Sequence, residues 1–396
     1  MSFRPLAAAG AAATVVLLLT SCSSGGDSGS GGSSGGAWQW GIDAELSGPL
    51  SFYGSSIAAG VQAYVDEANA DGGIAGRKIE ITQLDDGGDQ SRAATNATQL
   101  VTADKTIAIF GHTLSTNCAA AKPIVERYKV PMACLSVAES SDYVFNLGHD
   151  IGRAAPAMLE AAKKITGKDK LSAAAMIPTT LTGKQLAQGL QDQAKDAGVD
   201  LKTLQQFEIS ATDVSAQIAA VVAAKPDVVL ASNTGPGFLT VLRGLRAAQL
   251  QVPVIWVDGT GNLASIAEST DANVYAMTVH ELVDPAAAKG VAKDFADAAA
   301  PGIDGDVTQV SLNSGDRAVG YATARAFGEA LEKCGKDCTG EKLQGQLEKT
   351  SIDMDGLVPT FAYSSDDHYP YASWFLYRVT GTKYEEVGTF DAQSSK

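Results

Sequence analysis

Apolar and polar residues alternate along this chain in a pattern that predicts strands followed by helices. The short apolar run over residues 38–44 is typical of a buried strand. Ile57, Val61 and Val65 then recur at the spacing of one helix face, which predicts a helix over 54–70. The same order continues along the chain, as strand 78–85, helix 89–101, strand 106–110, helix 117–128 and strand 130–134.

This order of elements repeats in a second series of similar length. Its predicted elements are strand 171–177, helix 183–197, strand 201–209, helix 213–224, strand 227–231, helix 236–248 and strand 252–257. Alternating strands and helices favour parallel, doubly wound sheets. The chain therefore predicts an α/β fold with two similar lobes, completed by a helix near 315–334 and strands near 359–363 and 372–379. Chain crossings between the lobes would form a hinge beside a cleft.

The N-terminal segment has the features of a bacterial lipoprotein signal. Arg4 precedes an apolar run that is too short to span a bilayer comfortably, and Leu19-Thr20-Ser21-Cys22 matches a lipobox. Residues 1–21 are therefore a predicted signal peptide, and Cys22 a predicted lipidation site. Residues 23–36 are serine and glycine except for Asp27, so 22–36 is expected to be a flexible tether. An uncleaved anchor, or a plain signal peptide with an incidental cysteine, remains the alternative.

Charge and composition narrow the class of protein further. The net charge of −15 disfavours nucleic acid as a partner, because phosphates would be repelled. No second apolar run reaches membrane length. The body that follows the tether is therefore expected to be soluble and extracytoplasmic, and held at the cell membrane through Cys22.

The remaining four cysteines form an even set, as expected outside the cytoplasm. Three pairings are possible, and we predict the nearest-neighbour one, which joins Cys118 to Cys134 and Cys334 to Cys338. A zinc site at Cys334 and Cys338 is the alternative, although no second pair of ligands accompanies them.

Signals of catalysis are weak. His112, His149, His280 and His368 lie far apart and are expected to be surface or loop residues, not ligands. The sequence contains no HExxH, GxSxG or P-loop motif. The acidic loop 85–89 could bind a cation, but it lacks EF-hand spacing and is expected to be solvated. We therefore expect neither enzymatic activity nor a cofactor or metal.

More specific motifs occur in the first hundred residues. These are Leu46-Ser47-Gly48-Pro49, Tyr53-Gly54, the stretch 65–69 and the glycine-rich stretch 72–78. Together with the acidic loop and Gly111-His112, they resemble the branched-chain amino-acid-binding family, the type I periplasmic binding proteins of ABC importers. The resemblance extends more weakly over residues 38–390. It implies two Rossmann-like lobes joined by three crossings, which close on a small solute.

The resemblance also implies one wall of a ligand site. In the family, the turn after the strand ending in Gly-His holds the ligand carboxylate through a serine hydroxyl and backbone amides; Ser115 and Thr116 match that turn. A helix predicted to begin nearby would favour an anion. The loop after the next strand matches Ser136 and Ala138. Ala138 replaces an expected threonine, so one donor is missing, and Ser136 is a candidate to compensate for it.

Other family positions match residues on both lobes. The aromatic lid position matches Tyr53, and a tyrosine before glycine matches Thr182, which is a second departure from the family pattern. Another tyrosine-bearing loop matches Asn233 and Thr234. The acid that receives the ligand ammonium matches Asp258, whose side chain is one methylene shorter than the expected glutamate. Three of the matched residues have an ordinary alternative role. Tyr53 could simply pack in the core, Ser115 could cap a helix, and Asp258 could cap a turn.

The sequence and this resemblance therefore predict a monomeric, lipid-anchored solute-binding protein that delivers a small solute to an ABC permease. An amino acid or amide is the first candidate, and a polyol or an aromatic acid stays open. The expected lobes are 37–153 with about 283–356, and about 154–282 with 357–392. A sensor that docks on a membrane receptor is the alternative function, because it would use the same fold. A secreted enzyme and a repressor-type regulator are disfavoured, since the sequence shows no catalytic constellation and no helix-turn-helix.

Overall fold

The first lobe of the fold is built on a five-stranded parallel sheet. In the computed structural model its strand order is β2-β1-β3-β4-β5. The strands are β1 (Trp38–Ala44), β2 (Ile79–Asp85), β3 (Ala108–Gly111), β4 (Met132–Cys134) and β5 (Val144–Asn146). The helices that connect them are α1 (Ser51–Ala70), α2 (Gln90–Thr102) and α3 (Ser115–Tyr128). Asp89 caps α2 by accepting a hydrogen bond from the backbone N–H of Arg92.

The structure describes residues 36–137, 141–148, 151–208, 211–232, 237–257, 273–354, 356–371, 373–380 and 383–391. These residues belong to one compact unit, which begins at Gly35. The predicted signal peptide, Cys22 and the tether up to residue 35 lie outside the described residues.

The second lobe contains a seven-stranded sheet with the order β14-β13-β10-β9-β8-β6-β7. Its strands are β6 (Leu171–Pro178), β7 (Val199–Phe207), β8 (Val228–Ser232), β9 (Val254–Val257), β10 (Val274–Thr278), β13 (Ser373–Thr380) and β14 (Lys383–Asp391). Helices α4 (Ala155–Thr166), α5 (Leu181–Gln193), α6 (Ser215–Ala224) and α7 (Gly237–Ala247) belong to this lobe. Strands β6 to β10 are parallel and repeat the strand order of the first sheet, whereas β13 and β14 pair antiparallel. The predicted α/β fold with two parallel-sheet lobes is confirmed.

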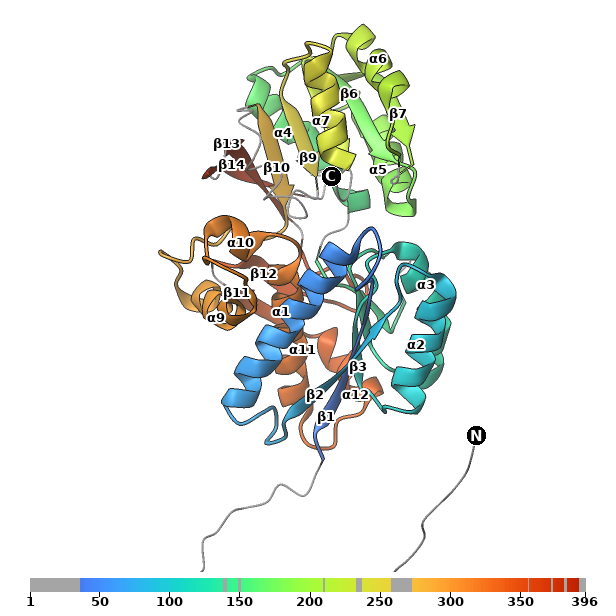
Figure 1. Cartoon of the computed structure of the whole chain (residues 1–396), viewed down its shortest axis with the longest axis vertical. Helices are drawn as coiled ribbons and strands as arrows, with labels where there is room; N and C mark the ends of the chain where they lie inside the picture. The colour runs from blue at the N-terminus through green and yellow to red at the C-terminus, as the bar shows by residue number, and fades with distance from the viewer. Residues whose placement is uncertain are drawn as a thin grey trace, which may run out of the picture. The chain divides into compact units, whose positions relative to one another are not determined.

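The chain between β10 and β13 returns to the first lobe. It forms α9 (Gly290–Ala299), α10 (Gln309–Asn313), α11 (Arg317–Cys334), α12 (Gly340–Leu347) and the hairpin of β11 (Ser351–Met354) and β12 (Val358–Ala362). Helix α11 packs along α1, as the orange and blue helices in Figure 1 show. Glycine permits this close approach, because a Cβ at Gly60 would lie 2.1 Å from the carbonyl oxygen of Arg317.

The strand order therefore makes the chain pass three times between the lobes. The passages follow β5, β10 and β12. The expected boundary between the lobes near residue 356 would divide the β11–β12 hairpin. The third passage instead follows β12. Two of the passages contact each other, because Arg153 forms an ion pair with Asp367 at 2.8 Å and lies 4.0 Å from the ring centre of Tyr369.

Both predicted disulfides are present. Cys118 of α3 is bonded to Cys134 of β4, and Cys334 is bonded to Cys338 after α11. The first disulfide fixes the beginning of α3 to the carboxyl end of the neighbouring strand.

The histidines were expected to be surface or loop residues. His112, His280 and His368 do lie in loops between elements, but all three are buried. Their burial depends on which segments cover the connections, and the local sequence does not contain that information. His149 lies outside the described residues.

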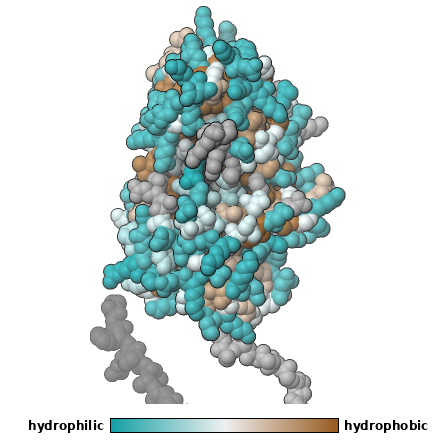
Figure 2. Space-filling model, turned by 180° about the vertical axis from the view of Figure 1, so that it is seen from behind, coloured by the Kyte–Doolittle hydropathy of each residue, from teal (hydrophilic) through white to brown (hydrophobic). Residues whose placement is uncertain are grey.

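The surface of the described body is dominated by polar side chains on the face drawn in Figure 2. Large apolar residues with high exposure are few among the described residues, and they are Phe52, Tyr128 and Leu181. No helix in the described part of the chain is both long and apolar enough to cross a bilayer.

Candidate functional site

A pocket lies where the carboxyl ends of strands from both lobes meet. The first lobe contributes Leu50, Tyr53, Thr113, Leu114, Ser115, Leu135 and Ser136, and Ile151, Pro178, Thr180, Thr182, Gly183 and Ser232 complete the lining. In open parallel sheets, this end of the strands is the usual position of a ligand. The described lining combines hydroxyl groups with apolar side chains and contains no charged residue.

The loop after β1 places Tyr53 in the first wall of the pocket. Glu45 accepts a hydrogen bond from the backbone N–H of Leu50 at 2.9 Å, and Asp85 accepts one from Leu46 at 2.9 Å. Hydrogen bonds to Asp85, above all the one from the Ser47 hydroxyl, hold the pKa of this carboxyl below its usual value. Asp85 is therefore ionised at neutral pH and can hold the loop through these bonds. Glycine is required at position 54, since a Cβ there would lie 2.2 Å from the carbonyl oxygen of Glu45. Helix α1 therefore begins against this loop, with Tyr53 in its first turn and only 2% exposed.

The turn before α3 forms the base of the same wall. Leu114 is the N-cap residue of α3 and has no side chain that can accept a hydrogen bond from the first helical N–H groups. The positive end of the helix dipole is therefore uncapped beside the Ser115 hydroxyl, which favours an anion or a carbonyl oxygen. Ser136 lies just after β4, and the Cys118–Cys134 disulfide joins that strand to α3.

The opposite wall is formed at the ends of β6 and β8. Thr180 caps α5, because its Oγ1 accepts a hydrogen bond from the backbone N–H of Gly183 at 3.0 Å. Gly183 must be glycine, since a Cβ there would lie 2.2 Å from the carbonyl oxygen of Pro178. The N-terminus of α5 is thus capped by its own chain, unlike that of α3. Ser232 is the last residue of β8 and places its side chain at the same end of the sheet.

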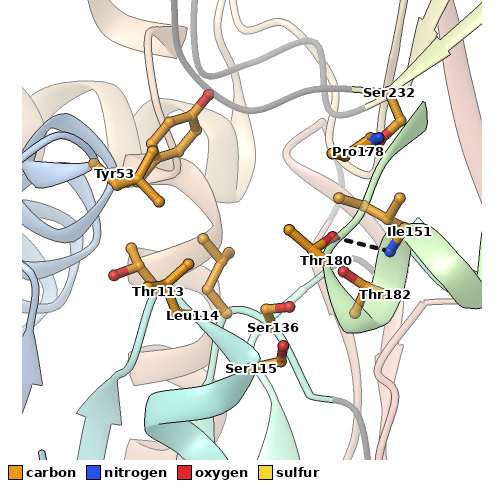
Figure 3. Close-up of a pocket in the computed structure, with 13 residues that line it drawn as sticks. Tyr53, Thr113, Leu114, Ser115, Ser136, Ile151, Pro178, Thr180, Thr182 and Ser232 are labelled. Carbon is orange, nitrogen blue, oxygen red and sulfur yellow. Dashed lines mark hydrogen bonds between the residues drawn. The ribbon is translucent and has the colours of Figure 1, made fainter. Parts of the chain in front are cut away.

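Figure 3 shows that the two groups of side chains face each other across an open space. Tyr53, Thr113, Leu114, Ser115 and Ser136 lie on one side of it. Pro178, Thr180, Thr182, Ile151 and Ser232 lie on the other side. A ligand in this space would therefore contact both lobes.

The structure brings together four of the residues expected at the site, namely Tyr53, Ser115, Ser136 and Thr182. Thr116 is half-buried in the first turn of α3 and is not part of the pocket lining. The other expected positions, Ala138, Asn233, Thr234 and Asp258, lie outside the described residues.

Several lining residues were not expected from the sequence. Leu135, Pro178 and Ser232 stand at or just after the carboxyl ends of β4, β6 and β8. Ligands of open parallel sheets usually bind at the carboxyl ends of the strands, and this general rule could have identified these three residues. Leu50 and Ile151 had no such signal. Leu50 directly precedes α1 and Ile151 begins a short 3-10 helix (Ile151–Arg153), and the path of both segments depends on the assembled lobes.

Metal-binding side chains are absent from the described lining of the pocket. One group in the described part of the chain could hold a metal ion, and it lies behind the first wall: Asp43, Asp86 and His112.

Comparison with known proteins agrees with this geometry. A family model described as "Periplasmic binding protein" matches residues 28–384. The chain belongs to the periplasmic binding protein family. Membership in a family of binding proteins agrees with the expectation that the chain is not an enzyme.

Curated relatives of this periplasmic binding protein are distant. Leu/Ile/Val-binding protein homolog 7 of Brucella suis is 28% identical over 202 residues, which cover 48% of this chain and 50% of that protein. The Leu/Ile/Val-binding protein of Escherichia coli K12 is 26% identical over 225 residues, which cover 55% and 60% of the two chains. The matched region is therefore about half to three-fifths of the length of these relatives.

Solved structures match the fold over a larger part of the chain. The branched-chain amino acid transporter substrate binding protein LivJ of Streptococcus pneumoniae, in complex with isoleucine, has a TM-score of 0.73 at 20% identity and covers 90% of this chain and 99% of its own. A solute binding protein of an ABC transporter from Rhodopseudomonas palustris, in complex with p-hydroxybenzoic acid, has a TM-score of 0.77 at 18% identity, with coverage of 90% and 98%. At these identities the likeness shows the fold.

Proposed function

We propose that this periplasmic binding protein captures a small polar solute between its lobes and delivers it to an ABC permease. The observation that carries the proposal is the pocket, whose lining comes from the strand ends of both sheets. A solute that contacts both walls stabilises a closed arrangement of the lobes, because those contacts are lost when the walls separate. The resulting closed surface is what a membrane permease would recognise.

The chemistry of the first wall supports a ligand with a carboxylate or carbonyl group. The uncapped N-terminus of α3, the Ser115 hydroxyl and the nearby Ser136 offer donors and positive potential. Leu50, Leu114 and Ile151 supply apolar contact for the rest of the ligand. The ligands in the similar solved structures, isoleucine and p-hydroxybenzoic acid, share this combination of a carboxylic acid and an apolar body.

Asp258 is the residue that we propose to select an amine on the ligand. It follows directly after Val257, the last residue of β9, which pairs with Ser232 of β8. Ser232 lines the pocket, so β9 ends beside a strand that reaches the pocket. An aspartate there would favour an amino acid or amide over an aromatic acid that lacks an amine. Asn233 and Thr234, which follow Ser232, are proposed as further contacts on this wall, and Ala138 as the position where the first wall lacks a hydroxyl.

Attachment to the membrane belongs to the same proposal. Lipidation of Cys22, followed by the Ser/Gly tether up to residue 36, would keep the body close to the permease. Cells grown with a radiolabelled fatty acid should incorporate the label into the wild-type chain, and a Cys22→Ala chain should carry none.

A ligand screen followed by variants in each wall tests the binding proposal. Thermal shift with leucine, isoleucine, amides and hydroxybenzoate identifies a ligand, because a ligand that binds only the folded chain raises its melting temperature. Calorimetry with that ligand should then show binding weakened about tenfold or more by Ser115→Ala and by Thr182→Ala, since each loses a contact. Ser215→Ala, at the start of α6 and away from the pocket, is the matched control. Unchanged affinity in both wall variants would refute the pocket as the site.

A further inference from the structure

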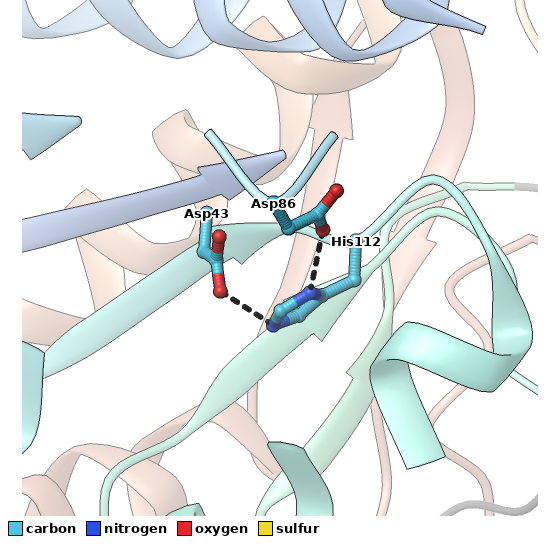
Figure 4. Close-up of side chains that lie close together, drawn as sticks. All are labelled: Asp43, Asp86 and His112. Carbon is cyan, nitrogen blue, oxygen red and sulfur yellow. Dashed lines mark ion pairs between the residues drawn. The ribbon is translucent and has the colours of Figure 1, made fainter. Parts of the chain in front are cut away.

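Three residues with ionisable side chains are buried together where β1, β2 and β3 end. Asp43 is the second-last residue of β1, Asp86 follows β2, and His112 follows β3. All three are completely buried. Figure 4 shows the imidazole ring of His112 between the two carboxylates, which the parallel register of the three strands brings together.

Each carboxylate uses one oxygen for a fixed donor and turns the other towards the ring. Oδ1 of Asp43 accepts a hydrogen bond from Asn96 at 2.8 Å, and Oδ1 of Asp86 accepts one from the backbone N–H of Gly88 at 2.8 Å. The second oxygens lie 3.7 Å and 3.5 Å from Nε2 and Nδ1 of His112, respectively. These separations exceed good hydrogen-bond distances of about 2.7–3.2 Å. Neither oxygen and neither ring nitrogen makes a hydrogen bond of good geometry in the described part of the chain, and the contact between Asp86 and His112 is at most a weak one.

The cluster also lacks enough positive charge for its carboxylates. Among the described residues, no lysine or arginine pairs with Asp43 or Asp86. Glu45 is buried close by, and its Oε2 also has no hydrogen-bond partner among the described residues. A carboxylate without a partner of opposite charge is costly to bury, so a cation at this place would be stabilising.

A fourth side chain gives independent support for a bound species. Asn117 of α3 is completely buried, and neither atom of its amide has a hydrogen-bond partner in the part of the chain that the structure describes. The amide approaches Asp86 closely enough to interact with that carboxylate, but without the geometry of a good hydrogen bond. Buried amides are normally hydrogen-bonded, so one that lies beside the cluster without a full set of partners points to a missing ligand.

We propose that Asp43, Asp86 and His112 bind a divalent transition-metal ion. Their ligand atoms all lie within 4.8 Å of one another. Ligands at about 2.0–2.2 Å from a tetrahedral zinc ion are about 3.4 Å apart, close to the separation between Asp86 and His112. One imidazole nitrogen with two carboxylates suits zinc or manganese better than calcium or magnesium, which prefer oxygen ligands alone. The ion would bind one ring nitrogen, and the carboxylate that faces the other nitrogen would turn towards the ion.

Such an ion would brace the wall of the solute pocket without contacting the solute. His112 directly precedes the turn Thr113–Ser115, and its backbone N–H donates to the carbonyl oxygen of Asp43 at 2.7 Å. The backbone of His112 has a φ of 46°, a conformation that residues other than glycine seldom adopt. An ion on the side chain would help to hold it. The proposal does not depend on the identity of the solute.

Metal content after refolding tests the proposal, because a buried site is accessible when the chain is unfolded. The full chain, without a histidine tag and with its disulfides intact, is unfolded in guanidinium chloride with EDTA. After removal of the EDTA it is refolded in excess Zn²⁺ or Mn²⁺ and separated from unbound metal by gel filtration. Inductively coupled plasma mass spectrometry should find about one metal ion per chain. The melting temperature should also be higher than that of the chain refolded in EDTA. His112→Gln should retain no ion. His368→Gln is the matched control, since His368 is also buried beside a carboxylate, that of Glu348.

Two results would overturn the proposal. One is wild-type chain that retains no ion and melts at the same temperature with and without metal; a purely proton-binding cluster would behave in this way. The other is equal retention by His112→Gln and the wild type, which would place the ion elsewhere. If His112→Gln does not fold, Asp43→Asn serves in its place, and the wild-type measurement decides even if neither variant folds.

Discussion

At the residue scale, the partly exposed Asp227 shows how one polar side chain joins two neighbouring strands, β6 and β8. It accepts hydrogen bonds from the backbone N–H and the hydroxyl of Ser172, at the beginning of β6, and from Lys168 at 2.6 Å. These interactions, of which the bond from Lys168 is the strongest, lower its pKa to about 2. The carboxylate therefore stabilises the folded chain while it is ionised.

The substitution Asp227→Asn tests this contribution through its dependence on pH. A lowered pKa means that the stabilisation is present above the unfolded value near 4 and is lost as the pH falls towards 2. Asp227 is partly exposed, so solvent screening reduces the expected loss at pH 7 to about 1 kcal/mol in the free energy of unfolding. Urea unfolding at several pH values should show the difference vanish at low pH. Asp196→Asn, an exposed position on the same lobe, should show no such loss.

Asp258→Asn tests the proposed ammonium contact. If leucine is a ligand, the substitution should weaken its binding at least tenfold, because the positive charge loses its partner. Binding of 4-methylpentanoate, which is leucine without its amino group, should change little. Calorimetry with both compounds separates the two effects. Equal weakening of both, or of neither, would contradict the assigned role.

At the same scale, the sequence predicted Tyr53, Ser115, Ser136 and Thr182 at one site, and the structure places all four in one pocket. The resemblance to the binding-protein family supplied these four positions, and their contact with a ligand stays a prediction. The burial of His112 was not predicted, because Asp43 and Asp86 reach it through the register of three strands that are far apart in sequence.

The Cys118–Cys134 disulfide acts at the scale of elements. It joins α3 to the end of β4, the two elements that carry Ser115 and lead to Ser136. We expect the double variant Cys118→Ala/Cys134→Ala to lose about 3 kcal/mol in the free energy of unfolding, because the bond closes a loop of 16 residues.

The second disulfide is the matched control for this prediction. Cys334 and Cys338 are only 4 residues apart, so removing both should cost less, about 2 kcal/mol. Chemical denaturation of the two double variants measures both losses. An equal or larger loss for the shorter loop would contradict the loop-closure argument.

Most elements could be predicted because they carry a clear hydrophobic pattern. Strand β1 was placed correctly, and α1 begins three residues earlier than expected. Strand β14 was missed, since its sequence is rich in charged and polar residues. It pairs antiparallel with β13 at the edge of the second sheet, where one face can remain in water. Strand β5 is only three residues long, and so short a run has little periodicity.

At the scale of the whole molecule, long-range packing determines what the sequence pattern left open. Helix α11 lies along α1 although more than two hundred residues separate them, and Gly60 and Gly320 permit the contact. The return of the chain after β10 and again after β12 produces two lobes with a pocket between their strand ends. The resemblance implied this course, but the hydrophobic pattern alone did not specify it.

Hydrogen exchange with and without a solute tests the central claim most directly, since it reports on both walls of the pocket in one experiment. With a ligand from the thermal-shift screen at saturation, exchange should slow in the segment 113–118 of the first lobe and in the segment 180–186 of the second. Helix α6, which is remote from the pocket, should be unaffected. Protection confined to one lobe, or absent from both segments, would contradict a solute bound between the lobes.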